Sequence, residues 1–208
     1  MSLRARARAW ATTSPTIEGW RRARYDRFVA LCGLEPDDRI LDVGAGLGAA
    51  LERFNNVNPI TAIDLTPNAS PWMEQPNVTA MIADATRMPF ADGEFAVAFS
   101  NSVIEHVPLE LQHAFASEVR RVSRRYFIQT PNRTFPIEPH YQFPLFQFLP
   151  ERARRFLNRH FTLGFQPKGH WEPIELLGAR DMQRLFPDAT IHREKVLGMT
   201  KSLMAVRR

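Results

Sequence analysis

Hydrophobic positions along this chain follow two alternating patterns. Five short runs rich in β-branched and aromatic residues are separated by longer helical or irregular stretches; the runs are Ile40–Val43, Ile60–Leu65, Thr79–Ala83, Phe95–Ser100 and Tyr126–Thr130. Such alternation is typical of crossover units that build a parallel sheet. Two more strands are expected at Thr190–Val196 and Ser202–Val206. The pattern predicts a doubly wound α/β fold with a mostly parallel, seven-stranded sheet and helices on both faces.

Apolar residues at helical spacing predict the helices. The first helix begins near Ile17 and is stopped by Gly33 and Pro36, and a second begins near Ala49. A third, amphipathic helix follows Pro108, with apolar residues at Leu111, Phe115, Val119 and Val122. Arginines 120, 121, 124 and 125 fall near its end, where cations are favourable. A short helix is expected at Asp181–Phe186.

The regular rhythm breaks between residues 131 and 171. This segment holds six prolines and a dense set of aromatic residues, which indicates an insertion, or lid, after the fifth strand rather than core architecture. Residues 1–16 alternate arginine with alanine at their start and are expected to be a loose basic arm; an organelle-targeting peptide is the alternative. We therefore expect one domain over residues 1–208.

Composition narrows the class of protein. Cys32 is the single cysteine among 208 residues, which excludes an internal disulfide and a four-cysteine zinc site. No apolar run approaches the ~20 residues of a membrane span, and no signal peptide opens the chain. We expect a soluble, cytoplasmic protein.

A glycine-rich turn follows the first predicted strand. Gly44, Gly46 and Gly48 allow a tight turn and leave no Cβ between the backbone and a ligand. The third glycine comes one residue too early for the G-x-G-x-x-G dinucleotide fingerprint, and no Lys-Ser/Thr pair completes a phosphate-binding P-loop. The spacing therefore disfavours an NAD-dependent oxidoreductase.

Acidic residues occur at corresponding places on the first three strands. Asp64 ends the second strand, 22 residues after Asp42, and Asp84 follows the third strand after another 20. Since the carboxyl ends of parallel strands open onto one crevice, all three carboxylates are expected to line it. A single such aspartate is usually a turn residue, but three in register indicate a ligand site. Carboxylates here can accept ribose hydroxyls or an adenine amine.

The sequence resembles the class I S-adenosylmethionine-dependent methyltransferases, in particular the small bacterial type 11-like group. The shared motifs are D-x-G-x-G-x-G at residues 42–48, the acid Asp64, D-A-x-x-x-P-F-x-D-x-x-F at 84–95 and E-H-V at 105–107. The resemblance implies S-adenosylmethionine as cofactor, S-adenosylhomocysteine as product and no metal. It implies these cofactor-binding residues: Asp42, Gly44, Ala45, Gly46, Gly48, Asp64, Leu65, Asp84, Ala85 and Asn101.

Two histidines are candidate catalytic bases. His106 follows the fourth strand and is expected beside the transferred methyl group, and an imidazole can accept a proton near neutral pH. A pocket-shaping role is the alternative, because E-H-V is common in the family with many substrates. His140 ends a polar, proline-rich run after the fifth strand, and the same run offers Asn132, Arg133 and Glu138 as substrate-binding residues. A surface turn is the alternative for this run.

The expected reaction is methyl transfer to a small-molecule or glycan-type acceptor at an oxygen atom. A non-catalytic sensor or scaffold that binds the same cofactor is an alternative. A third hypothesis is a lipid-linked acceptor with peripheral membrane contact, because aromatics and arginines alternate between residues 141 and 165.

Basic charge raises the question of a nucleic-acid partner. The net charge of +5 comes from 24 arginines and 3 lysines, which is compatible with a polyanion. However, residues 100–103 read Ser-Asn-Ser-Val, without the Asn/Asp-Pro-Pro-aromatic tetrad by which amino-methylating nucleic-acid enzymes grip a base. Nucleic acid is therefore disfavoured, and the sequence does not indicate an oligomeric state.

Overall fold

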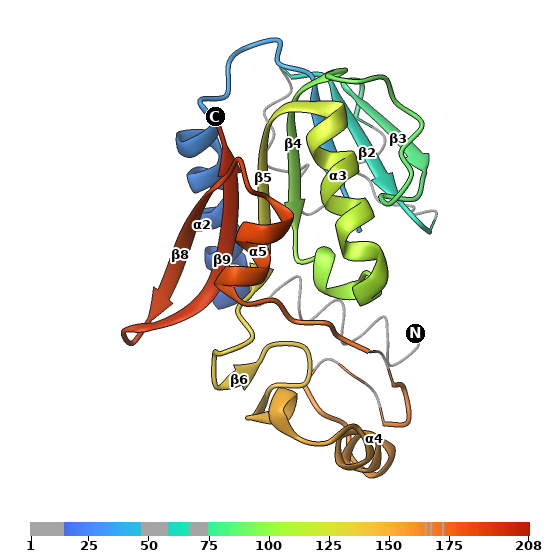
Figure 1. The fold of residues 1–208 in the computed structure, drawn as a ribbon, viewed down its shortest axis with the longest axis vertical. Helices are drawn as coiled ribbons and strands as arrows, with labels where there is room; N and C mark the ends of the chain where they lie inside the picture. The colour runs from blue at the N-terminus through green and yellow to red at the C-terminus, as the bar shows by residue number, and fades with distance from the viewer. Residues whose placement is uncertain (1–14, 47–57, 67–74, 165, 167, 172) are drawn as a thin grey trace.

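One seven-stranded sheet organises the molecule (Figure 1). The computed structural model describes residues 15–46, 58–66, 75–164, 166, 168–171 and 173–208. The strands of the sheet are β1 (Ile40–Val43), β2 (Ile60–Asp64), β3 (Val78–Ile82), β4 (Phe95–Asn101), β5 (Ser123–Pro131), β8 (Thr190–Val196) and β9 (Met199–Arg207). The predicted mostly parallel α/β sheet is confirmed.

Strand order places a crevice at a defined position. The order is β3-β2-β1-β4-β5-β9-β8, in which β9 runs antiparallel to both β5 and β8 and the other pairs are parallel. The chain progresses outward from β1 to β3 and then returns to β4 on the other side of β1. Ligands in open α/β sheets bind outside the carboxyl ends of the strands at such a reversal. A ligand site is therefore expected at the carboxyl ends of β1 and β4.

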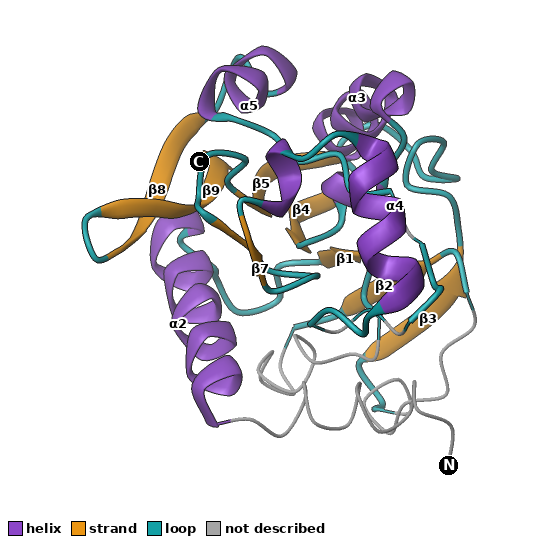
Figure 2. Cartoon of the chain, turned by 90° about the horizontal axis from the view of Figure 1, so that it is seen from below, coloured by secondary structure: helices purple, strands orange, loops and turns teal. Residues whose placement is uncertain are grey.

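Helices cover both faces of the sheet. The helix α2 (Pro15–Cys32) lies on one side, and α3 (Gln112–Val122) and α5 (Ala179–Leu185) lie on the other, as the view along the strands shows (Figure 2). Alternate residues of a strand face opposite sides, so Ile40 packs with the α2 layer and Leu41 with the α3 layer. Apolar contacts therefore bury residues on both faces of the sheet.

The α2 layer is anchored by aromatic packing. The ring of Phe28 lies 4.9 Å from that of Phe99 and 5.8 Å from that of Phe127, centroid to centroid. All three side chains are buried. Burying one such ring contributes roughly 1.5–3 kcal/mol, so these contacts fix α2 against β4 and β5.

The four arginines predicted near the end of α3 divide into two pairs. Arg120 and Arg121 lie in its last turn, as expected, whereas Arg124 and Arg125 belong to β5, which begins directly at Ser123. The Arg125 guanidinium reaches the end of α2, donating to the carbonyl oxygens of Cys32 (2.8 Å) and Gly33 (2.6 Å) and to Asp38 (2.6 Å). It therefore ties α2 to the sheet.

The segment after β5 forms a small apolar core of its own. Its elements are β6 (Ile137–Glu138), β7 (Phe143–Pro144), the 3-10 turn η5 (Phe146–Phe148) and α4 (Glu151–His160). Tyr141, Phe146 and Ile174 are buried together. Figures 1 and 2 place α4 beyond the carboxyl ends of the strands, on the side of the crevice.

Some expectations fall outside the described residues: the arm over residues 1–14, the helix beginning near Ala49, Gly48 and Phe165. The two final residues of the expected arm, 15 and 16, already belong to α2. Within the described part of the chain, no helix has the length and apolar character needed to cross a membrane.

Candidate active site

The glycine turn after β1 is held against β2 by its own backbone. The amides of Gly44 and Ala45 donate to the carbonyl oxygen of Ile63 at 2.8 and 3.0 Å. The amide of Gly46 donates to Oδ2 of Asp64 at 3.0 Å. Asp64 therefore fixes the turn, in addition to any contact with a ligand.

Gly44 also brings this turn against the segment that follows β4. Its φ is +74°, and a Cβ there would lie 2.4 Å from Cγ2 of Val103. Only glycine fits both the backbone angle and the space. The close approach places the turn beside the 3-10 turn η3 (Ile104–His106), which begins one residue after Val103.

Asp42 is a buried carboxyl at the base of the turn. Its side chain is 2% exposed, and its Oδ2 has no hydrogen-bond partner within the described residues. Burial, and secondly the charge of Asp64, raise the pKa of Asp42 to about 7. The structure thus keeps an unpaired carboxyl oxygen where the sequence predicts cofactor contact.

Asp64 and Asp84 have matching local structures. In each, Oδ1 accepts hydrogen bonds from the backbone amide and the hydroxyl of a threonine two residues later, Thr66 and Thr86, at 2.8–3.0 Å. These are Asx turns, the ordinary role of an aspartate after a strand. Each carboxylate oxygen has two lone pairs, so both side chains retain capacity for a ligand.

The remaining predicted cofactor residues that the structure describes lie at the same edge. Leu65, directly after β2, is 69% exposed, and Ala85 packs in part on the core. Asn101 ends β4 and accepts a hydrogen bond from Nη1 of Arg24 at 3.2 Å. Their contact with a cofactor stays a prediction.

The sequence did not single out two cationic residues, Arg24, which donates to Asn101, and Lys201, which interacts with Arg24 through its charge. Arg24 also donates to Ser202 at 3.3 Å and lies 3.5 Å from Glu194. Burial lowers the pKa of Arg24, and burial with the nearby Arg24 charge lowers the pKa of Lys201 to about 8. A signal existed, since Arg24 lies four residues before the buried Phe28, on the same side of the helix.

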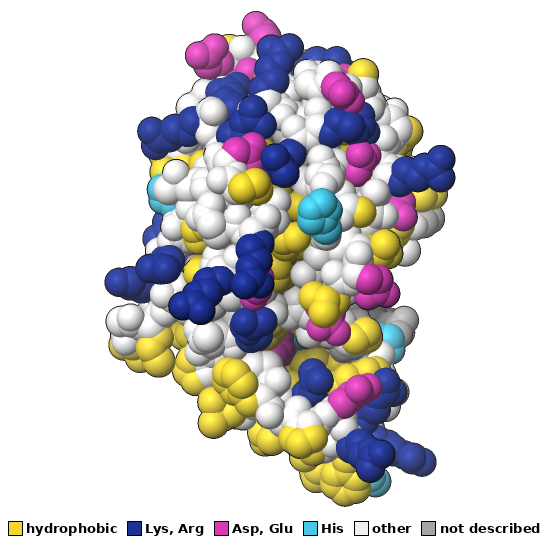
Figure 3. Space-filling view, viewed as in Figure 1, with side chains coloured by type: hydrophobic (Ala, Val, Ile, Leu, Met, Phe, Trp, Pro, Cys, Tyr) yellow, Lys and Arg dark blue, Asp and Glu magenta, His cyan; other side chains and the backbone are white. Residues whose placement is uncertain are grey.

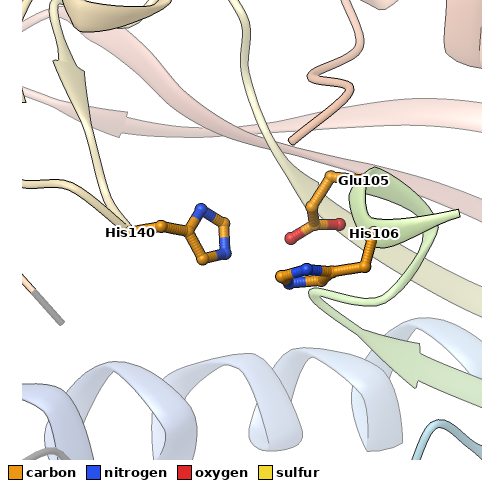
Figure 4. Close-up of side chains that lie close together, drawn as sticks. All are labelled: Glu105, His106 and His140. Carbon is orange, nitrogen blue, oxygen red and sulfur yellow. The ribbon is translucent and has the colours of Figure 1, made fainter. Parts of the chain in front are cut away.

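A cluster of three polar side chains is the second part of the site. Glu105 and His106 come from η3, and His140 comes from the loop between β6 and β7 (Figure 4). The two imidazole rings lie edge to face, with their centroids 4.9 Å apart. Glu105 is fully buried, and its Oε2 accepts a hydrogen bond from the Thr130 hydroxyl at 3.0 Å. The fold therefore brings together the two histidines that the sequence offered separately as bases.

The predicted substrate residues occupy three different environments. Glu138 is buried and accepts hydrogen bonds from Nδ1 of His140 and from the amide of Tyr141, both at 2.6 Å. Asn132 is buried and its amide donates to Thr134 and to a backbone carbonyl oxygen, at 2.8 Å in both cases. Arg133 forms an ion pair with Asp181 at 3.1 Å. Glu138 thus supports His140, and substrate contact by the three residues stays a prediction.

Comparison with known proteins finds similarity to one protein family. Residues 41–126 match the protein family described as "Methyltransferase domain". A demethylmenaquinone methyltransferase of Beutenbergia cavernae is 31% identical over 108 residues, which is 50% of this chain and 42% of the relative. An uncharacterized protein of Mycobacterium tuberculosis is 32% identical over 52% of this chain and 40% of its own. The chain thus spans about two fifths of the length of the curated relatives it matches.

Two solved structures share the fold over almost the whole chain. The 1,6-didemethyltoxoflavin-N1-methyltransferase of Burkholderia thailandensis, crystallised with S-adenosylhomocysteine, has a TM-score of 0.65 at 15% identity, over 98% of this chain and 85% of its own. The geranyl diphosphate C-methyltransferase of Streptomyces coelicolor has a TM-score of 0.58 at 17% identity, over 94% and 85%. The chain therefore shares the fold of these two methyltransferases.

Proposed function

We propose that this chain, whose residues 41–126 match the methyltransferase-domain family, transfers a methyl group from S-adenosylmethionine to a small-molecule acceptor. The observation that carries the proposal is the contact between Gly44 and Val103. It joins the glycine turn of a cofactor site to the polar cluster of an acceptor site at one end of the sheet. The product of the cofactor would be S-adenosylhomocysteine.

The residues at the carboxyl ends of β1 to β3 fit such a cofactor. Among the residues that the structure describes, the nearest atom that a Cβ on Gly46 would meet is 4.0 Å away. In the described part of the chain, Asp42 has a buried oxygen without a hydrogen-bond partner. Asp64 ends β2 and Asp84 follows β3, at the same end of the sheet. We assign the ribose hydroxyls to Asp64, the adenine amine to Asp84 and Ala85, and the methionine portion to the turn and Asn101.

The acceptor would lie at the Glu105, His106 and His140 cluster. When bound, S-adenosylmethionine supplies an already activated methyl group, so the chain must mainly position the acceptor, exclude water and take up a proton. His140 suits the last task. Its Nδ1 is held by Glu138 at 2.6 Å, which leaves Nε2 as the nitrogen that can accept a proton from an acceptor hydroxyl. The segment over residues 131–171 lies across this end of the sheet and would act as the lid.

Methyl transfer to oxygen is the form of the reaction that this cluster favours. A hydroxyl acceptor needs a base, whereas an amine with a free lone pair does not, and the structure holds two imidazoles beside a carboxylate. A cofactor sensor without catalysis has no use for such a cluster.

Matched variants test the cofactor assignment. Asp84→Asn removes the charge of a proposed adenine ligand, while Asp37→Asn makes the same change at an exposed position before β1, near the opposite end of the sheet. We expect the dissociation constant for S-adenosylhomocysteine to rise at least ~5-fold in the first variant and to stay constant in the second. Equal affinity in both variants would refute the role of Asp84.

An acceptor panel tests the reaction. The protein is incubated with S-adenosylmethionine and a set of phenols, sugars and amines, and methylated products are detected by mass spectrometry. We expect methylation of a hydroxyl compound, slowed ~100-fold or more by His140→Gln. Methylation confined to amines would contradict the O-methylation proposal, and binding of the cofactor with no turnover across the panel would favour the sensor.

A surface feature favours a lipid-linked acceptor as the second candidate. Hydrophobic side chains gather at the end of the molecule formed by residues 137–161, with basic side chains beside them (Figure 3). Each of Leu145, Phe148, Phe156 and Phe161 is more than half exposed. Exposed aromatics flanked by arginines suit an anionic lipid surface.

Vesicle sedimentation separates this candidate from a freely diffusing acceptor. A lipid-linked acceptor predicts binding to anionic phosphatidylglycerol vesicles that is lost in the double variant Phe148→Ser, Phe156→Ser. It predicts unchanged binding in Leu109→Ser, which alters an equally exposed leucine on η4 (Leu109–Leu111). Protein that stays in the supernatant would exclude this candidate.

A further inference from the structure

The acceptor cluster also has the composition and spacing of a metal site. One ligand atom from each of Glu105, His106 and His140 lies within 4.8 Å of the others. Figure 4 shows the Glu105 carboxylate beside the His106 imidazole, with the His140 imidazole directed toward both. Sequence spacing did not reveal this set, because His140 lies 34 residues after His106 and only the fold joins them.

Glu105 has an environment that a cation would complete. Its side chain is fully buried, and while Oε2 accepts from Thr130, Oε1 has no hydrogen-bond partner in the described parts of the chain. A buried, unpaired carboxylate oxygen is costly. The guanidinium of Arg24 interacts with Glu105 only through space, so a ligand to Oε1 is still lacking.

His140 is oriented as metal-binding histidines are. Its Nδ1 pairs with Oε1 of the buried Glu138 at 2.6 Å, and Oε2 of Glu138 is held by the amide of Tyr141. Such a carboxylate fixes the tautomer and leaves Nε2 as the ligand atom. The loop is itself fixed, because a Cβ on Gly164 would lie 2.7 Å from the carbonyl oxygen of His140. The structure therefore holds both His140 and the Glu138 carboxylate that orients it in place.

The backbone around Glu105 is equally constrained. The side-chain amide of Gln112 donates to the carbonyl oxygens of Ile104 and Glu175, at 3.1 Å in both cases. The backbone oxygen of Glu105 accepts from the amide of Glu175 at 2.7 Å. These bonds hold η3 in place, and the His106 side chain on this turn is exposed.

We propose that Glu105, His106 and His140 bind one divalent first-row transition-metal ion, with Glu138 as the positioning residue of His140. Two imidazoles and one carboxylate favour zinc, cobalt, manganese or iron over magnesium and calcium, which prefer oxygen ligands. At metal–ligand distances of about 2.1 Å, tetrahedral ligand atoms lie about 3.4 Å apart. The three atoms must therefore approach one another by about 1.4 Å at most when a metal ion binds.

The ion would have a defined role in the reaction, and this role rests on the proposed function. Three protein ligands leave a coordination position open for the acceptor hydroxyl oxygen. A metal-bound hydroxyl releases its proton to solvent more readily, and the oxygen then forms a bond to the methyl carbon as the bond between that carbon and sulfur breaks. In this arrangement the imidazoles act as ligands, and the ion takes over the activation of the acceptor that His140 would otherwise perform as a base.

Metal titration of the untagged protein tests the site. After removal of metals with a chelator and dialysis, the protein is titrated calorimetrically with Zn²⁺ and, separately, with Mg²⁺, and Co²⁺ binding is followed by its visible absorption. We expect one equivalent of Zn²⁺ and of Co²⁺, with Mg²⁺ at least ~100-fold weaker. His140→Ala and His106→Ala should each weaken Zn²⁺ binding ~100-fold or more, and Glu138→Gln about 10-fold.

Controls separate this site from adventitious binding and from misfolding. His113→Ala removes an exposed histidine of α3 and should leave Zn²⁺ affinity unchanged. His106 is exposed, so its variant should fold, which circular dichroism checks. A protein that binds no Zn²⁺, or whose Zn²⁺ affinity is unchanged from that of the parent protein in His106→Ala and His140→Ala, would overturn the proposal. The proposed function fails differently: the metal-free protein would then not bind S-adenosylhomocysteine in the same calorimeter.

Discussion

The buried carboxyl of Asp42 should make folding stability depend on pH. Burial and the charge of Asp64 raise the pKa of Asp42 from 3.8 to about 7 in the folded chain. The folded state therefore holds a proton on this carboxyl between about pH 4 and pH 7 that the unfolded state has released. The stability conferred by a protonated Asp42 is fully present below pH 4, and is lost as the pH rises toward 7 and stays lost above it.

The magnitude of the effect follows from that difference. With carboxyl pKa values of 3.8 unfolded and about 7 folded, the free energy of unfolding should fall by about 2.5 kcal/mol between pH 5 and pH 8 through this group alone. Asp42→Asn removes the titration. The variant's stability relative to the parent protein should therefore rise by about 2.5 kcal/mol from pH 5 to pH 8.

Urea unfolding of both proteins at pH 5, 6, 7 and 8, followed by circular dichroism, measures this difference. The comparison between pH values cancels the fixed cost of placing a buried amide at this position. If the difference between the two proteins were the same at pH 5 and pH 8, Asp42 would titrate normally, and the inferred desolvation at the base of the glycine turn would be wrong.

Three further predictions concern the fold. Gly44→Ala should lower the free energy of unfolding by about 3 kcal/mol in urea titrations, because its φ is +74° and the new Cβ would clash with Val103. Gly93→Ala is the control: its φ is +63°, no described atom lies within 4 Å of the new Cβ, and it should cost only about 1 kcal/mol. Equal costs would contradict the steric argument. Arg125→Met should lower the free energy of unfolding by about 2 kcal/mol, because two carbonyl oxygens at the end of α2 lose a charged donor. An unchanged free energy of unfolding in the same assay would show that α2 docks without Arg125. The thiol of Cys32 is buried and its pKa is raised to about 12, so at pH 8 a disulfide reagent should label it at least ~100-fold more slowly in the folded than in the unfolded protein; equal rates would show that α2 does not cover it.

Much of the fold followed from the sequence because its signals are local. The strand Thr190–Val196 was predicted at its observed bounds, and the other strands to within a few residues. The start of β5 was missed because Ser123, Arg124 and Arg125 are polar. Ser123 is satisfied by a hydrogen bond to Val119 and Arg125 by the end of α2, and a sequence pattern does not contain such long-range partners.

The site was predictable only in part, for a similar reason. The glycine turn and its acids are encoded in short motifs, so Gly44 and Asp64 could be found by their spacing. Glu105 could not be distinguished from its neighbours, because its burial and its unpaired oxygen depend on contacts with Thr130 and Gln112 made only in the folded chain. Glu138 was predicted as a substrate residue from its place in the polar run, and its hydrogen bonds to His140 and Tyr141 could not be read from that run.

Calorimetric titration with S-adenosylhomocysteine and, separately, with NAD tests the central claim most directly. The account predicts that one equivalent of S-adenosylhomocysteine binds, that Asp64→Ala removes most of the affinity because the Gly46 amide and the ribose both lose their acceptor, and that NAD does not bind. Binding of NAD without binding of S-adenosylhomocysteine would contradict it.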